Sequence, residues 1–270
     1  MKLRAPIVLA AALLTASCAA SLTKLPSGPG EAAPDGAEAL NQALSTCQRI
    51  RTVSAELSVR GKIGSQGMRG RLLAGLVAPA DAYLEAPAPF GSPIFIYSAS
   101  GDDATLLLPR DRRVLEHGRP ADVFEAIAGV PLGPADLRAT LTGCADAGDQ
   151  ARTQRIGDAW RLVSGTSDLY LHRSKAADPW RLVAVVHRGA GRTWRADYSD
   201  FLNDLPRTIR LTSSDAPPLD LRLALADLEI NGTLDPATFR VQVPAGAVPM
   251  TIQELRQAGP LAERSSTSNE

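Results

Sequence analysis

The sequence contains few of the residues that usually carry catalysis or bind metal ions. Among 270 residues there are only three histidines and three cysteines. His117, His172 and His187 do not have metal-ligand spacing with another histidine, cysteine or carboxylate. No Gly-x-Ser-x-Gly nucleophile motif and no phosphate-binding loop is present. The segment "HRGAGRTW" has only a Gly-x-Gly and predicts a hairpin turn. We therefore expect no metal, no cofactor and no enzymatic activity.

The sequence also lacks an excess of charge of either sign. Its 29 basic and 29 acidic residues give a formal net charge of zero. A neutral chain has no electrostatic reason to bind a nucleic acid, and no basic amphipathic helix for an anionic bilayer is evident. Nucleic acid is therefore not expected among its partners.

A hydrophobic run long enough to span a membrane is absent as well. The apolar stretch Ile7 to Leu14 has about half of the roughly 20 residues that a membrane-spanning helix needs. Lys2 and Arg4 precede this stretch, and the small residues Thr15-Ala16-Ser17 follow it. This order is typical of a secretory signal, so we expect residues 1–17 to be removed.

The residues around Cys18 resemble the bacterial lipobox, in which the cysteine is lipidated and becomes the first residue of the mature protein. The resemblance implies a membrane anchor at Cys18; plain secretion with an unmodified cysteine is the alternative. Ala19 is not the aspartate that resembles an inner-membrane retention signal, which favours the periplasmic side of the outer membrane of a Gram-negative bacterium.

The segment after Cys18 is rich in proline and glycine and predicts a tether over residues 18–36. Pro26, Pro29 and Pro34 lie in it. Residues 37–258 are enough for one domain with a sizeable core, and residues 259–270 are expected to form a loose tail. In an oxidising compartment Cys47 and Cys144 could form a disulfide; two buried thiols are the alternative.

The hydrophobic pattern alternates between helical and extended periods along this domain. Helices are expected at 37–51, 121–128, 134–142 and 250–258. Alternation over 53–63 predicts a half-buried strand, and similar patterns recur along the domain, the last of them at 239–243. About ten or eleven strands without regular helix alternation predict an α+β fold: a large curved antiparallel sheet, an open half-barrel with capping helices. Because few helices are available to cover that sheet, we expect them to enclose a hydrophobic cavity suited to an acyl chain.

Several segments, in their order along the chain, resemble the outer-membrane lipoprotein-localisation acceptor family, LolB-like. They are "YLEAPAPFGSPIFIYSASGDDATLLLP", "GVPLGPADLRATLTG", "DAWRLVSG" and "LPRTIRLTSS". A more distant member of the lipoprotein-carrier superfamily would show a similar order. The resemblance implies a monomer whose half-barrel takes lipoprotein acyl chains of the palmitate class from a soluble periplasmic carrier and releases them into the outer membrane.

In that family an apolar residue on a protruding loop helps delivery to the membrane, and Phe90 stands at the matching loop. A loop aromatic folded back onto the core is the alternative. Two other functions remain open: a general binder of hydrophobic ligands, and a non-catalytic structural envelope lipoprotein.

The cavity lining is predicted from the side chains expected to point inward. Each of them could equally be plain core, so only the group is the hypothesis. The predicted lining is Leu57, Val59, Leu72, Ile94, Ile96, Leu106, Leu108, Leu162 and Trp194. Alternating arginines such as Arg60, Arg69, Arg71 and Arg210 predict a solvated outer face, or a rim that steers a carrier.

Overall fold

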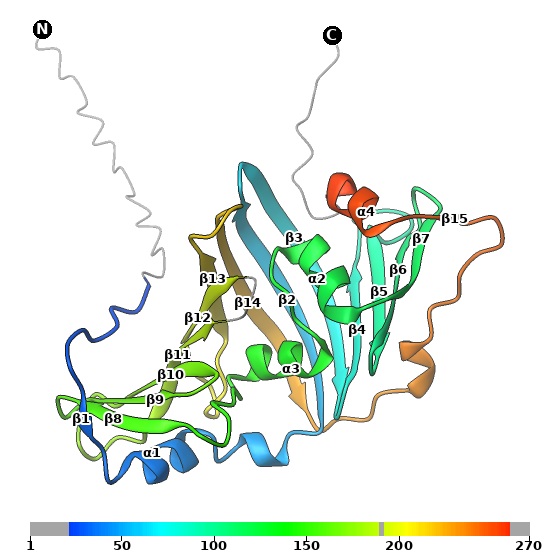
Figure 1. The fold of residues 1–270 in the computed structure, drawn as a ribbon. Helices are drawn as coiled ribbons and strands as arrows, with labels where there is room; N and C mark the ends of the chain where they lie inside the picture. The colour runs from blue at the N-terminus through cyan, green and yellow to red at the C-terminus, as the bar shows by residue number, and fades with distance from the viewer. Residues whose placement is uncertain (1–21, 189–191, 260–270) are drawn as a thin grey trace, which may run out of the picture.

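A computed structural model describes residues 22–188 and 192–259 of the chain. The predicted signal at 1–17, Cys18 and most of the predicted tail lie outside these residues. Within them the chain forms one strongly curved sheet with short helices at its concave face and ends (Figure 1). No helix in the described part of the chain is both long and apolar enough to cross a bilayer.

The sheet contains fifteen strands in the order β1-β8-β9-β10-β11-β12-β13-β14-β2-β3-β4-β5-β6-β7-β15. The first half of the chain supplies β1 (Glu31–Ala32), β2 (Thr52–Ile63), β3 (Gln66–Val77), β4 (Asp81–Ala86), β5 (Phe95–Ser100), β6 (Asp103–Leu108) and β7 (Arg113–Gly118). The second half supplies β8 (Arg152–Ile156), β9 (Trp160–Ser164), β10 (Ser167–His172), β11 (Arg181–Arg188), β12 (Thr193–Ser199), β13 (Thr208–Ser213), β14 (Leu219–Ile230) and β15 (Val248–Pro249). The predicted α+β class with one large curved sheet is confirmed.

The strand count and one strand position differ from the sequence prediction. The two-residue strands β1 and β15 and the polar β8 carry no recognisable alternation, and β15 pairs with β7 in parallel, so the sheet is mixed. The strand predicted over 239–243 does not form. Its place is taken by the 3₁₀ turn η2 (Pro236–Phe239), which lies across β4 and β5, where the Ser98 hydroxyl donates to the Phe239 carbonyl at 2.6 Å.

The helices are α1 (Gly36–Ala43), α2 (Pro120–Ala128), α3 (Pro134–Thr142) and α4 (Ile252–Ala258), with a 3₁₀ turn η1 (Cys47–Arg49). Proline occupies the first turn of α2 and of α3, where its missing N–H is not needed. Each of these two helices ends at a left-handed glycine, Gly129 or Gly143. The predicted first helix stops early: α1 ends at Ala43 and only η1 continues it.

One apolar row runs across the concave face of the sheet, because every second side chain of each strand points to that face. Apolar residues of the row pair with one another on neighbouring strands. Leu169, for example, pairs with Val163 on one side and with Val185 on the other. The helices α2 and α3 lie inside the curve of the sheet, where α3 contacts β3 and β4 and α2 contacts β6 (Figure 1). The core therefore lies between the concave face and the helices α2 and α3, and α1 covers its β8–β11 end.

The segment predicted to be a free tether is attached to the domain from Thr23 onward. The Thr23 N–H donates to Asp197 Oδ1 at 3.0 Å, and Arg155 and Arg161 form ion pairs with Glu31 and Asp35. Residues Glu31–Ala32 pair with β8 as β1. These ion pairs and the β1 pairing hold the proline-containing segment on the sheet. Composition alone does not predict this attachment.

Candidate functional site

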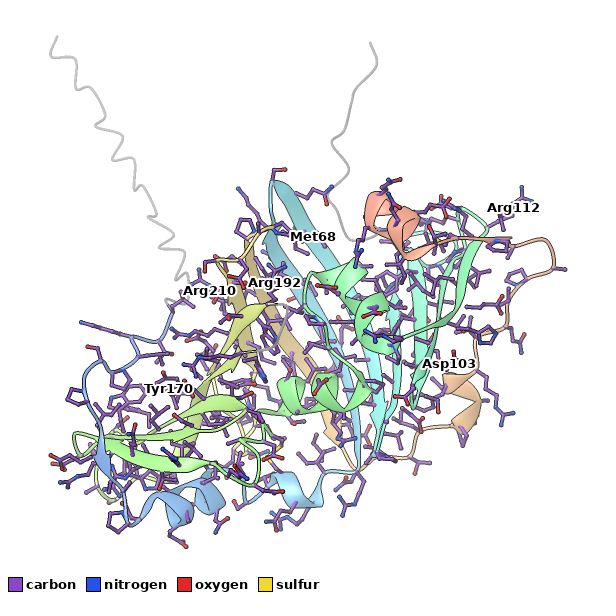
Figure 2. All side chains as sticks on the ribbon, viewed as in Figure 1. Met68, Asp103, Arg112, Tyr170, Arg192 and Arg210 are labelled. Atoms are coloured by element: carbon purple, nitrogen blue, oxygen red, sulfur yellow. A yellow bond between two sulfur atoms is a disulfide. The ribbon has the colours of Figure 1, made fainter. Side chains whose placement is uncertain are left out.

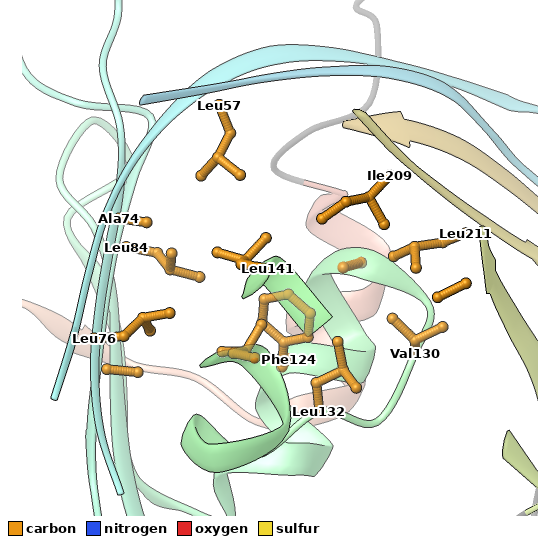
Figure 3. Packing of buried hydrophobic residues seen from close by; sticks show 14 of the residues in the cluster. Leu57, Ala74, Leu76, Leu84, Phe124, Val130, Leu132, Leu141, Ile209 and Leu211 are labelled. Carbon is orange, nitrogen blue, oxygen red and sulfur yellow. The ribbon is translucent and has the colours of Figure 1, made fainter. Parts of the chain in front are cut away.

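The candidate site is the apolar space between the concave face and the two helices α2 and α3 (Figure 3). The sheet lines it with Leu57, Val59, Leu72, Leu84, Phe95, Leu211, Leu221 and Leu223. The helical segment lines it with Phe124, Ile127, Ala128, Leu132, Leu137, Thr140 and Leu141. Thr140 is the one polar side chain among these, so the space offers mainly van der Waals contact to a ligand.

The free volume of this space is small. It measures about 50 Å³, against roughly 30 Å³ for one water in the liquid and roughly 300 Å³ for the smallest usual ligand pockets. The predicted cavity therefore has the expected apolar lining but not the expected size. Phe124 and Leu141 point from the helices toward Leu84 and Leu57 of the sheet and occupy the hollow (Figure 3).

A second, larger space lies at the rim on the other side of α2. It measures about 540 Å³ and is lined by the β2–β3 turn, by α2 and by the loop after β13. Met68 and Arg192 face it from the two halves of the sheet (Figure 2). Ile127 of α2 lines both this rim space and the inner apolar space. Helix α2 is therefore the partition between them.

The predicted lining residues fall into three groups in the structure. Leu57, Val59 and Leu72 line the inner space. Leu106, Leu108 and Trp194 are buried in the same apolar cluster without lining that space, and Ile94 is half-buried against it.

Ile96 and Leu162 lie on the opposite face of the sheet. Their strand neighbours Phe95 and Val163 take the buried positions, at 1% and 0% exposure. Ile96 pairs with Glu85 and Leu162 pairs with Gln154. Their predicted inward orientation was wrong because two apolar residues stand side by side in each strand, so alternation alone leaves the choice of face open.

The lining from α2 and α3 was not among the predicted site residues. The sequence signal for it exists, because Phe124 and Ile127 share one helical face and Leu137 and Leu141 share another. Placing those faces against β2 and β14 requires the tertiary fold.

Phe90 lies at the tip of the β4–β5 loop with 88% of its surface exposed, so it is not folded back onto the core. Arg110, in the β6–β7 turn, fixes this loop. Its guanidinium donates to the carbonyl oxygens of Ser92 and Phe90 at 3.0 and 2.9 Å. The role of Arg110 could not be predicted because it depends on two turns meeting at one end of the sheet.

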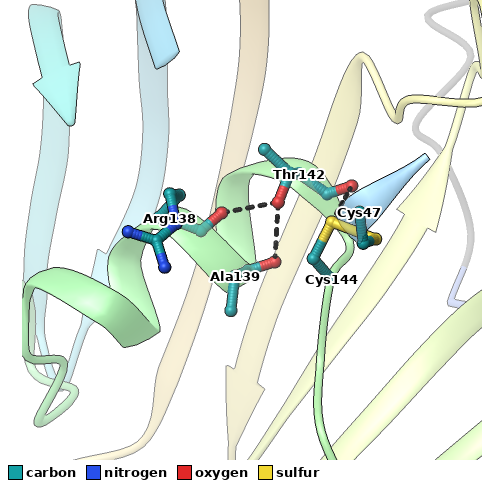
Figure 4. Close-up of a disulfide and its surroundings, with 5 residues drawn as sticks. All are labelled: Cys47, Arg138, Ala139, Thr142 and Cys144. Carbon is teal, nitrogen blue, oxygen red and sulfur yellow. Dashed lines mark hydrogen bonds between the residues drawn. A yellow bond between two sulfur atoms is a disulfide. The ribbon is translucent and has the colours of Figure 1, made fainter. Parts of the chain in front are cut away.

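Cys47 and Cys144 are joined by a disulfide, with their Cα atoms 5.4 Å apart (Figure 4). The bond links η1 to the chain just after α3, where the Thr142 hydroxyl donates to the Arg138 carbonyl at 2.7 Å. One end of α3 is thereby fixed to the N-terminal part of the domain.

A half-buried histidine, His187, lies on the concave face away from the apolar space. Its ring stacks on Trp194 with centroids 3.9 Å apart, and its Nδ1 lies 3.0 Å from the Ser167 hydroxyl. Burial lowers the pKa of His187 to about 4, and the charge of Asp136 opposes part of that shift. Within the described ranges no carboxylate hydrogen-bonds this ring, and no group of three or more possible metal ligands occurs.

No protein-family model matches the sequence, and no curated protein matches it. Among solved structures, a LolA superfamily protein from Nitrosomonas europaea is similar over 76% of this chain and 97% of its own, with 14% identity and a TM-score of 0.54. A putative outer membrane lipoprotein-sorting protein domain from Vibrio parahaemolyticus covers 76% of this chain and 97% of its own, with 14% identity and a TM-score of 0.45. The chain thus shares the open half-barrel fold of the Nitrosomonas LolA superfamily protein.

Proposed function

We propose that this protein is a membrane-anchored envelope lipoprotein that binds acyl chains on the concave face of its half-barrel. In this proposal it receives lipoproteins from a soluble periplasmic carrier and delivers them to the outer membrane. The observation that carries the proposal is the inner space, whose lining from the sheet and from two short helices is apolar except for Thr140. The fold shared with a LolA superfamily protein supports it.

Acyl-chain binding requires α2 and α3 to move away from the sheet, because about 50 Å³ cannot hold such a chain. Burial of the acyl chain offsets part of the packing that this movement loses. Each methylene buried on the sheet contributes about 0.8 kcal/mol, which replaces the packing of Phe124, Leu137 and Leu141 against the strands. Displacing α2 would also join the inner space to the rim space of about 540 Å³, giving the chain an access route.

The anchor in this proposal is lipid on Cys18, and the location is the periplasmic face of the outer membrane. The hydrogen bond between Thr23 and Asp197 supports a short connection, because few residues separate Cys18 from Thr23. An extended chain spans at most about 3.6 Å per residue, so the domain would lie close to the bilayer. The proposed protein is a monomer.

The acyl-binding step is tested by filling the inner space. Ala128→Leu adds three carbons next to the free volume and should hold α2 on the sheet. We expect the purified full chain to carry palmitate-class lipid by mass spectrometry, and the variant to carry several-fold less with an unchanged or raised melting temperature. Ala135→Leu, on the exposed side of α3, is the matched control and should load like the parent.

The outcomes separate the candidate functions. Lipid loading together with uptake of a lipoprotein from a soluble carrier supports the acceptor. Loading without such uptake identifies a general hydrophobic-ligand binder. Complete absence of bound lipid in the parent chain would leave only a structural role and refute the proposal.

Delivery is assigned to the Phe90 loop in this proposal. An exposed aromatic ring on a proline-flanked loop can enter the bilayer interface, whereas a carboxylate there opposes insertion. Phe90→Glu should keep folding and lipid loading but slow release of cargo to vesicles at least several-fold. Leu202→Glu, at another exposed apolar side chain on the β12–β13 loop, should release cargo normally. Equal release by both variants would contradict the loop assignment.

A further inference from the structure

A separate groove lies on the far side of α3 from the apolar space. It measures about 350 Å³ and runs between α1 with η1 on one wall and α3 on the other, beside the Cys47–Cys144 disulfide. This volume falls within the range of small-molecule sites, roughly 300–1,000 Å³. The groove shares no lining residue with the inner apolar space.

The walls of this groove are mixed: apolar side chains lie beside the polar Asn41, Gln48 and Thr142. Leu40 and Leu44 come from the first helical segment, Ile50 from the chain just before β2, and Ala139 from α3. Ile50 is 4% exposed, so it is a floor residue and not a loose surface side chain. Such walls suit a short hydrocarbon chain.

Two arginines, Arg51 and Arg138, line this groove. The β3–β4 turn brings them together: Ala78 N–H donates to the Arg51 carbonyl at 2.8 Å, and Arg138 Nη1 donates to the Pro79 carbonyl at 3.1 Å. Burial, and then the positive charge of Arg51, lower the pKa of Arg138. Arg138 nevertheless stays protonated, because guanidinium does not lose its proton in proteins.

The two guanidinium groups lack acidic partners among the described residues. No ion pair in this part of the chain joins Arg51 or Arg138 to a carboxylate, and the Arg51 side chain makes no hydrogen bond there. Asp146 also lines the groove and accepts from the Gly148 N–H at 2.9 Å, so one negative charge opposes the two positive charges of the lining. Two guanidinium groups that line one groove can donate charge-assisted hydrogen bonds to an anion.

The groove is preformed. The disulfide joins its two walls, and the carbonyl of Arg138 is held by the Thr142 hydroxyl (Figure 4). A ligand would therefore bind without ordering new backbone, which lowers the entropic cost of association.

We propose that this groove binds a small amphiphile whose carboxylate or phosphate head lies between Arg51 and Arg138 and whose short alkyl chain lies on Leu40, Leu44 and Ile50. The volume sets the size of the ligand. About 350 Å³ lies at the small end of the range for ligand sites, so we choose a chain of about eight carbons with its head. The site does not depend on acyl-chain binding at the concave face.

The experiment uses octanoate as the probe, titrated into the full chain by calorimetry at low and high salt. A charge-assisted hydrogen bond is worth roughly 1.5–3 kcal/mol, so Arg51→Gln and Arg138→Gln should each weaken octanoate binding about tenfold or more. Neutral octanamide should bind weakly to the parent chain, and high salt should lower the affinity of the chain for octanoate. A titration with octyl phosphate in place of octanoate shows whether Arg51 and Arg138 bind a phosphate or a carboxylate head group more tightly.

Controls separate this groove from other binding. Arg69→Gln, at an exposed position far along β3, should bind octanoate like the parent. Ala139→Met should reduce binding by filling the groove without removing charge. Ala128→Leu should leave it unchanged, because Ala128 lines only the inner space among these cavities. Equal octanoate affinity in the parent and both arginine variants, or equal affinity for octanamide, would overturn the proposal.

Discussion

At the scale of single residues, the group around His187 shows how tertiary burial changes the chemistry of a side chain. Trp194 stacks on one face of the ring, and the Ser167 hydroxyl lies at Nδ1. The negative charge of Asp136 in α3 raises the pKa of the ring and so opposes the effect of burial. A histidine with a folded pKa of about 4 is neutral at pH 7, where the Ser167 hydroxyl can donate to it. The Ser–His pair therefore supports the packing of the concave face.

This burial predicts a loss of stability in mild acid. The unfolded state binds a proton near pH 6.5 and the folded state only near pH 4, so the free energy of unfolding falls as the pH drops through that window. The expected loss is on the order of 2 kcal/mol, less than the full shift implies because the ring keeps some contact with water. Urea denaturation at several pH values measures it.

A variant isolates the contribution of His187, because burial also lowers the pKa of His172. His187→Phe keeps the ring stack on Trp194 and removes the titrating group, so the decline between pH 6.5 and 4 should be shallower. His117→Phe, at an exposed side chain, is the control for loss of a histidine outside the core. An unchanged slope in His187→Phe would show that His187 is not the responsible group.

At the scale of elements, α3 is held differently at its two ends. Its C-terminal end is fixed through Cys144 to η1, whereas its N-terminal end follows the short connection from Gly129 to Gly133 after α2. Motion of the helical pair away from the sheet is therefore expected to pivot near the disulfide.

The disulfide should also stabilise the whole domain. It joins cysteines 97 residues apart, and loss of such a bond typically costs about 2–5 kcal/mol. The double variant Cys47→Ser with Cys144→Ser should lose about that much free energy of unfolding in urea. A reducing agent should affect the parent chain in the same way and leave the double variant unaffected. Coincident parent and double-variant curves would contradict this assignment.

At the scale of the molecule, the sheet is open but its edges are covered. The two-residue strands β1 and β15 pair with β8 and β7 at the two ends of the strand order. Short edge strands leave few free backbone groups for pairing with another chain. This arrangement supports the proposed monomer while keeping the half-barrel open.

If α2 and α3 move away from the sheet, their amide hydrogens should exchange faster than those of the central strands. The central strands β2 and β3 are twelve residues long and hydrogen-bonded to strands on both sides, whereas α2 and α3 are short and held mainly by side-chain packing. Amide hydrogens of residues 120–142 should therefore exchange faster than those of β2 and β3, and bound lipid should change exchange chiefly in the helices. Uniform exchange across both regions would argue against a movable cover.

The sequence determined the parts of the fold that depend on local pattern. Strand alternation at residues 53–63 predicted β2, and proline with glycine at 134 and 143 delimited α3. Both signals are local because backbone preference and side-chain period act over neighbouring residues.

Only the tertiary structure decided which apolar side chains share a face and which distant charges meet. Phe95 and Ile96 are both apolar, and the choice between them depends on strands supplied by other parts of the chain. Whether the hollow is open or filled depends on how far Phe124 and Leu141 reach from their helices. The approach of Arg51 to Arg138 depends on the β3–β4 turn, because local preferences carry no information about residues far apart along the chain.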